Sequence, residues 1–161
     1  MPAFRLSIPA ADLTRRLKER LRGDPPNASQ RVVWRRDADS VLVYADSLNA
    51  RLLDGWLLCN LNLETTQTGV QTLQFVYFLG KEGEGAGIQA SCTINAPAAG
   101  AAQIAAAWGA DLQRVLWDAV LDAIEVTVYH ADTVSKGAPL TIGGFHCKPE
   151  ALYVDILAGS R

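Results

Sequence analysis

An adjacent histidine and cysteine, His146 and Cys147, form the pattern with the clearest chemical meaning in this sequence. A histidine can act as the base that activates a cysteine nucleophile, provided that the two side chains hydrogen-bond. On a strand, however, neighbouring side chains point to opposite faces, so the pair would function only in a turn. Gly143 and Gly144 lie just upstream and could introduce such a turn. Because the surrounding residues are typical of a strand, we expect no catalytic pair here.

A second arrangement, His130 followed by Asp132, offers two metal ligands, and His146 could complete a set of three. Zinc takes three or four protein ligands, most often nitrogen or sulfur atoms, and the whole chain holds two histidines. The cysteines show no spacing typical of a metal site. We therefore expect no metal and no cofactor. A hydrolase or isomerase that uses the His130 and His146 region is the least favoured of three functions.

The segment GKEGEGAG at residues 80–87 is rich enough in glycine to be tested as a phosphate-binding loop. Such a loop needs a lysine followed by serine or threonine and then a helix, whose N-terminal amides meet the anion. Here Glu82 follows Lys81, Glu84 adds a second negative charge, and a strand comes next. Since these carboxylates would repel phosphate, the segment predicts a hairpin loop.

Aromatic and aliphatic residues give the strongest indication of a binding surface. The run from Phe75 to Leu79 is apolar at every position, so both faces of that predicted strand must be covered. Trp117 and Leu121 lie at the edge of the apolar arc of a predicted long helix, which leaves apolar surface beyond one sheet–helix interface. Large exposed apolar patches are rare on monomers and usually mark an interface or a ligand site.

This excess of apolar surface suggests two sets of candidate binding residues. The first set would form an interface between copies of the chain and consists of Val76, Phe78, Trp117 and Leu121. The second set would line a pocket for a small apolar ligand between the sheet and the long helix and consists of Trp56, Phe75, Tyr77 and Trp108. The alternative, that the N-terminal helix or the terminal strands cover the second face, remains open.

The composition is that of a folded domain. With 161 residues, 49% of them hydrophobic and 20% charged, the chain is long enough for one domain, residues 1–161, with a sizeable core. No apolar run approaches the ~18 residues of a membrane span, and the N-terminal residues lack the features of a signal peptide. Cys59, Cys92 and Cys147 are an odd number of cysteines, which we interpret as reduced thiols in a cytoplasmic protein.

The net charge of −2 hides an asymmetry between the two parts of the chain. Residues 1–36 hold nine basic and three acidic residues, a net charge of +6, and residues 37–161 carry the remaining −8. A basic N-terminal helix could meet nucleic-acid phosphates or an anionic membrane. It could also complement the acidic remainder of the same molecule or of a neighbouring subunit. We favour the second interpretation and expect no nucleic-acid partner, because the strands lack the basic and aromatic mixture of a nucleic-acid platform.

Hydrophobic periodicity predicts where the strands and helices lie. A stripe of Leu13, Leu17 and Leu21 predicts a short N-terminal helix, and a broad apolar arc predicts a long helix over residues 98–124. Residues 124–130 alternate like a strand but follow the helix without a stop signal, so their state is left open. Strands are expected at residues 3–9, 31–36, 40–46, 55–64, 70–79, 87–95, 139–147 and 151–159.

Strands that follow one another through short turns form an antiparallel meander. The expected architecture is α+β: a meander sheet of five or more strands packed on one long helix, with a short basic N-terminal helix. The leading functional hypothesis is a non-enzymatic cytoplasmic module that associates with copies of itself. The second is a carrier or sensor of a small apolar ligand, held between the sheet and the long helix.

Overall fold

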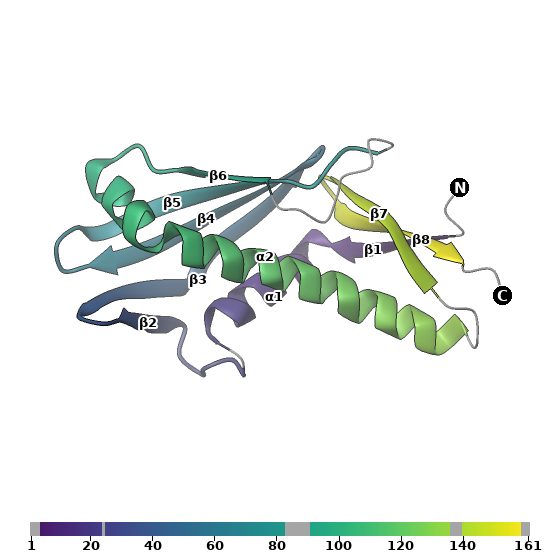
Figure 1. Cartoon of the computed structure of the whole chain (residues 1–161), viewed down its shortest axis with the longest axis horizontal. Coiled ribbons are helices and arrows are strands. Elements are labelled where there is room, and N and C mark those ends of the chain that lie inside the picture. The colour runs from purple at the N-terminus through teal and green to yellow at the C-terminus, as the bar shows by residue number, and fades with distance from the viewer. Residues whose placement is uncertain (1–3, 24, 83–90, 136–139, 159–161) are drawn as a thin grey trace.

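A computed structural model describes residues 4–23, 25–82, 91–135 and 140–158. The side chains of residues 91 and 130–141 lie outside that description. The elements in chain order are β1 (Phe4–Pro9), α1 (Ala10–Leu21), β2 (Arg31–Arg36), β3 (Asp39–Leu53), β4 (Trp56–Thr65), β5 (Gly69–Phe78), β6 (Ser91–Asn95), α2 (Ala99–Ser135), β7 (Leu140–Lys148) and β8 (Ala151–Ala158). The predicted α+β class is confirmed, with a long helix and a short N-terminal helix (Figure 1).

Five consecutive strands form the larger sheet, in the antiparallel order β2-β3-β4-β5-β6, which confirms the predicted meander. Alternation divides each strand between two faces. In β4, for example, Leu57, Cys59 and Leu61 are fully buried, while Leu58 and Asn60 point to the other face and are half-buried. We call these the inner and the outer face of the sheet.

Strands from the two ends of the chain form a second, smaller sheet in the order β1-β8-β7. The sequence predicted these strands individually but not that they would form a sheet of their own. β1 pairs antiparallel with β8, for example Phe4 with Ile156 and Ile8 with Leu152. The register between β7 and β8 shifts between Ile142 and Gly144, where two glycines follow each other, and no turn interrupts the strand.

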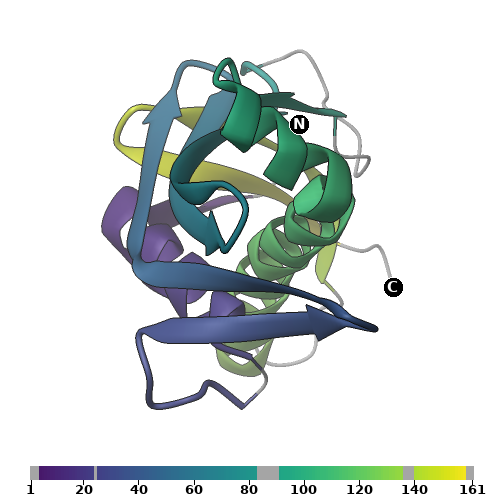
Figure 2. The same cartoon turned by 90° about the vertical axis from the view of Figure 1, so that its left-hand side faces the viewer.

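The helix α2 is longer than the sequence predicted, since residues 124–130 continue it instead of starting a strand. The hydroxyl of Thr127 donates to the carbonyl of Ala123 one turn earlier, at 2.8 Å, so this β-branched residue is accommodated in the helix. In Figure 2 the larger sheet curls around α2. The leucine stripe of α1 is buried, and α1 packs against β3 and α2.

The inner face of the larger sheet and the helix α2 meet around Tyr77. Its ring stacks on Trp117 with centroids 5.8 Å apart, and its hydroxyl donates to the carbonyl of Gln113 at 2.8 Å. Trp117 also contacts Phe145 of β7. One side chain of α2 therefore packs against both sheets.

The two sheets are joined by backbone hydrogen bonds at one corner. The amide of Gly55, in the turn between β3 and β4, donates to the carbonyl of Cys147, and the amide of Cys147 donates to the carbonyl of Gly80. The amide of Leu79 donates to the carbonyl of Gly55 at 2.8 Å. Gly55 and Gly80 have φ values of 88° and 91°, where a side chain would be strained. This corner fixes the β3–β4 turn, and with it the adjacent end of the outer face.

Candidate functional site

Apolar side chains gather at one end of the outer face of the larger sheet. Cross-strand pairing aligns Leu53 with Trp56 and Trp56 with Phe78, and in the next row it aligns Leu58 with Val76. We call these five residues the outer patch. The rings of Trp56 and Phe78 meet edge to face with centroids 4.9 Å apart. Trp56 is 39% exposed, although it is a large aromatic residue.

Amide side chains border the outer patch on the same face. Asn60 pairs with Gln74, and Asn95 donates from Nδ2 to Oε1 of Gln74 at 2.9 Å. Arg51 lies opposite Leu58 and is exposed. The patch is thus an uncharged apolar surface with a polar border, which is the usual anatomy of a protein interface.

The structure divides the predicted interface residues between two surfaces. Val76 and Phe78 belong to the outer patch. Trp117 and Leu121 lie on α2, where Trp117 packs against Tyr77 on the inner face of the sheet. The two pairs are therefore separated by the sheet itself.

The predicted ligand-binding residues are also divided by the sheet. Phe75 and Tyr77 are fully buried on the inner face, and Trp108 of α2 is 4% exposed. Trp56 points to the opposite face, since it aligns with Phe78. Binding of an apolar ligand remains a prediction.

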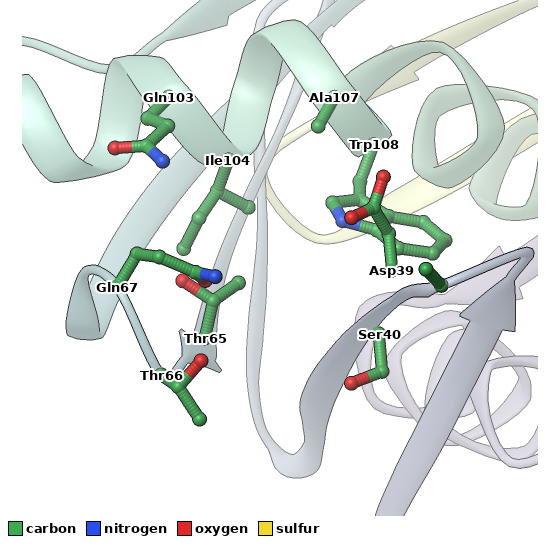
Figure 3. Close-up of a pocket in the computed structure, with 10 residues that line it drawn as sticks. Asp39, Ser40, Thr65, Thr66, Gln67, Gln103, Ile104, Ala107 and Trp108 are labelled. Atoms are coloured by element: carbon green, nitrogen blue, oxygen red, sulfur yellow. The ribbon is translucent and has the colours of Figure 1, made fainter.

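A polar cavity of about 290 Å³ opens beside Trp108. The β2–β3 turn and the start of β3 contribute residues 38–40, and the end of β4 and the β4–β5 turn contribute residues 65–67. Gln103, Ile104, Ala107 and Trp108 line the cavity from α2 (Figure 3). The sequence singled out Trp108 but gave no indication of the turn residues, which lie far from it along the chain.

Arg36 fixes one wall of this cavity. Its guanidinium lies over the indole ring of Trp108, 4.5 Å from the ring centroid, and Nη1 pairs with Asp111 at 3.0 Å. Nη2 also donates to the carbonyl of Ala107. These contacts hold the end of the β2 strand against α2.

His146 and Cys147 point to opposite faces of β7, as expected for neighbours on a strand. The thiol of Cys147 is buried and lies 3.3 Å from the carbonyl oxygen of Leu53, and burial raises the pKa of Cys147 to about 11. A thiol with such a pKa is protonated at neutral pH and is a poor nucleophile.

His146 lies in a polar cluster on the outer side of the smaller sheet. Its ring stacks on Tyr153, and Nδ1 is 3.8 Å from Asp155. Among the residues that the structure describes, its buried Nε2 has no hydrogen-bond partner. Burial, followed by the positive charge of Arg5, lowers the pKa of His146.

His130 and Asp132, two of the candidate metal ligands, have side chains that lie outside the described residues. Within the described part of the chain, no group of three or more His, Cys, Asp or Glu side chains could hold a metal ion. The three cysteines there are not disulfide-bonded.

Ion pairs connect the basic N-terminal segment to the acidic remainder of the same chain. Arg5 pairs with Asp155 at 2.7 Å, and Arg20 pairs with Asp122 at 3.1 Å. Arg36 pairs with Asp111, as described above. The charge asymmetry of the sequence is thus partly neutralised within one molecule.

Comparisons with known proteins found no matching family model, no matching curated protein and no matching solved structure. Among the described helices, none is long and apolar enough to cross a membrane.

Proposed function

We propose that this protein is a non-enzymatic module that associates with a second copy of itself through the outer patch, namely Leu53, Trp56, Leu58, Val76 and Phe78. The observation that carries the proposal is the exposure of Trp56 and Leu53, 39% and 37%, in a row of apolar side chains that Phe78 continues. Exposed aromatic residues within a polar border are typical interface anchors. The interface that we propose keeps Val76 and Phe78 of the predicted set and omits Trp117 and Leu121.

A second copy of the chain suits this surface because a twofold contact places the same surface on both sides. An apolar patch with an amide border is compatible with itself, since it brings no like charges together at its centre. Arg51 and Asp54 are exposed residues of opposite charge near its edge. A twofold axis through the patch can place the cation of one copy near the anion of the other.

The test compares glutamate substitutions at two positions on the outer face. Phe78→Glu introduces a charge into the outer patch and should convert a dimer to a monomer, as measured by native mass spectrometry against the chain mass of 17.3 kDa. Val33→Glu is the matched control, because Val33 is 48% exposed, aligns with Leu42 on the same face and lies in β2, two strands away from β4. This variant should remain a dimer.

Circular dichroism separates loss of association from loss of folding. Both variants should keep the wild-type spectrum, because both positions lie on the outer face and not in the core. A wild-type protein that is monomeric at micromolar concentration would refute the proposal. Dissociation of both variants alike would assign the interface to a larger part of the sheet than the outer patch.

A further inference from the structure

The geometry points to a second site, independent of the proposed self-association: the cavity beside Trp108 binds a neutral saccharide unit. This cavity lies between α2 and the turns β2–β3 and β4–β5, whereas the outer patch lies around the β3–β4 turn. Its volume of about 290 Å³ is at the lower end for ligand pockets, which span roughly 300–1,000 Å³. The space therefore fits one sugar ring and not an extended chain.

The lining of the cavity combines an apolar floor with unused polar groups. Ile104 and Trp108 are almost fully buried and form the floor. Among the residues that the structure describes, several lining side chains make no hydrogen bond to another protein group; they are Asp39, Ser40, Thr66, Gln67 and Gln103. Figure 3 shows the side chains of Gln67 and Gln103 on the same side of the cavity. Hydroxyl, carboxamide and carboxylate groups are the donors and acceptors that sugar hydroxyls require.

The charge of the lining selects against anionic ligands. Among the described residues, Asp39 is the one charged residue that lines the cavity, so phosphates and carboxylates would be repelled. Arg36 does not offset this charge at the cavity, since its guanidinium is engaged by Asp111 and covers Trp108. A neutral polyhydroxyl compound uses the whole set of polar groups, with the carboxylate of Asp39 accepting two neighbouring hydroxyls.

The walls of the cavity are held in place without a ligand. Arg36 attaches the end of β2 to α2, as described above. On the other side, the hydroxyls of Thr65 and Thr68 are 2.7 Å apart, and Gln71 donates to the carbonyl of Thr68 at 2.9 Å. A preformed site loses little conformational entropy on binding.

The experiment titrates ¹⁵N-labelled protein with D-glucose, D-galactose, D-mannose and their methyl glycosides, up to about 10 mM, well above a Kd of ~1 mM. At least one sugar should shift the amide resonances of residues 38–40, 65–67 and 103–108 and saturate. Binding of a methyl glycoside would indicate that the natural ligand is the terminal sugar of a glycan. Binding of the free sugar alone would indicate a soluble sugar.

A matched pair of variants tests the role of the carboxylate. Asp39→Asn keeps the shape but loses one acceptor and the charge, so the Kd of the best sugar should rise about tenfold or more. Asp37→Asn makes the same change two residues away, at a residue that does not line the cavity and whose φ of 53° asparagine tolerates. The Asp37→Asn variant should bind the same sugar with the Kd of the wild type.

Three results would overturn this inference. They are the absence of any saturable shift, equal affinities of the two variants, and saturable binding of tetramethylammonium or inorganic phosphate at the same resonances in preference to the sugars. Because the titration can be read on a monomer or a dimer, its failure is distinguishable from failure of the proposed self-association.

Discussion

Burial, and not spacing along the chain, determines the chemistry of the cysteines. Cys59 is fully buried, and burial raises its pKa to about 12, while the pKa of Cys147 is raised to about 11. Cys92 is half-buried, and its pKa is also raised, chiefly by burial. All three thiols are therefore protonated at neutral pH, and access of the reagent decides which one reacts.

We expect iodoacetamide at pH 7.5 to label Cys92 first and to leave Cys59 and Cys147 unmodified in the folded protein. Access is greatest at Cys92, since the other two thiols lie in the core. Peptide mapping by mass spectrometry, with a urea-unfolded sample as the control for intrinsic reactivity, measures the order. Rapid labelling of Cys147 in the folded state would contradict its burial.

The polar cluster around His146 predicts a pH dependence of stability. The charged and titratable groups that face this histidine are Arg5 of β1, Lys148 of β7, Tyr153 and Asp155 of β8, and Glu82 after β5. Its pKa is lowered below the ordinary value of about 6.5, so the unfolded chain takes up a proton first as the pH falls. The contribution of His146 to the free energy of unfolding should therefore be constant at neutral pH and decrease as the pH falls through 6.5.

A His146→Phe variant should lose this decrease between pH 7 and pH 5, because phenylalanine can stack on Tyr153 but does not titrate. Glu82 does not interfere in this range: Lys148 and Arg5 lower its pKa from 4.5 to about 2, so its contribution to stability is lost only below pH 4.5. Urea denaturation at a series of pH values gives both curves. An unchanged slope in His146→Phe would assign the effect to another group.

At the scale of elements, the close approach of α2 to β6 depends on Gly109. A Cβ atom at this position would lie 2.8 Å from Cδ1 of Ile94, and the helix continues without a break through the glycine. Gly109 therefore serves close packing and does not break the helix. Alanine in a helix interior is otherwise favoured over glycine by about 1 kcal/mol.

A double-mutant cycle tests this packing. Gly109→Ala alone should stabilise the protein by clearly less than ~1 kcal/mol, because the end of the Ile94 side chain must move. In an Ile94→Val background, which lacks Cδ1, Gly109→Ala should raise the free energy of unfolding by the full ~1 kcal/mol. Equal gains in the two backgrounds, measured by urea denaturation, would show that the two residues are not coupled.

Local patterns predicted most elements, and tertiary context decided the rest. Alternation found the strands of the larger sheet, but Val126 and Val128 suggested a strand where α2 continues, since packing outweighs their weak preference. The same alternation could also have predicted on which face Trp56 lies. Trp56 precedes Leu58 by two residues and therefore points to the same outer face. The cavity beside Trp108 could not be predicted, because its turn residues meet only once the sheet has curled around α2.

At the scale of the whole molecule, the proposed self-association would link stability to protein concentration. A dimer that dissociates on unfolding is stabilised by mass action, so the Tm of the wild type should rise with protein concentration. The Phe78→Glu variant, as a monomer, should have a Tm that is independent of concentration. Differential scanning calorimetry over a hundredfold range of concentration measures both, and a constant wild-type Tm would contradict the proposed dimer.

The pairing of β1 with β8 has a consequence for how the chain is made. A ribosome adds roughly 5–20 residues per second, so β8 emerges roughly 7–30 s after β1. Throughout that interval Ile8 lacks β8, and for most of it the leucine stripe of α1 lacks α2, although α1 can pack against β3 soon after it is made. The larger sheet can form its hairpins as each strand emerges, because its neighbours are consecutive in the chain. β1 is thus synthesised long before its strand partner, and it is where a chaperone at the ribosome exit would bind.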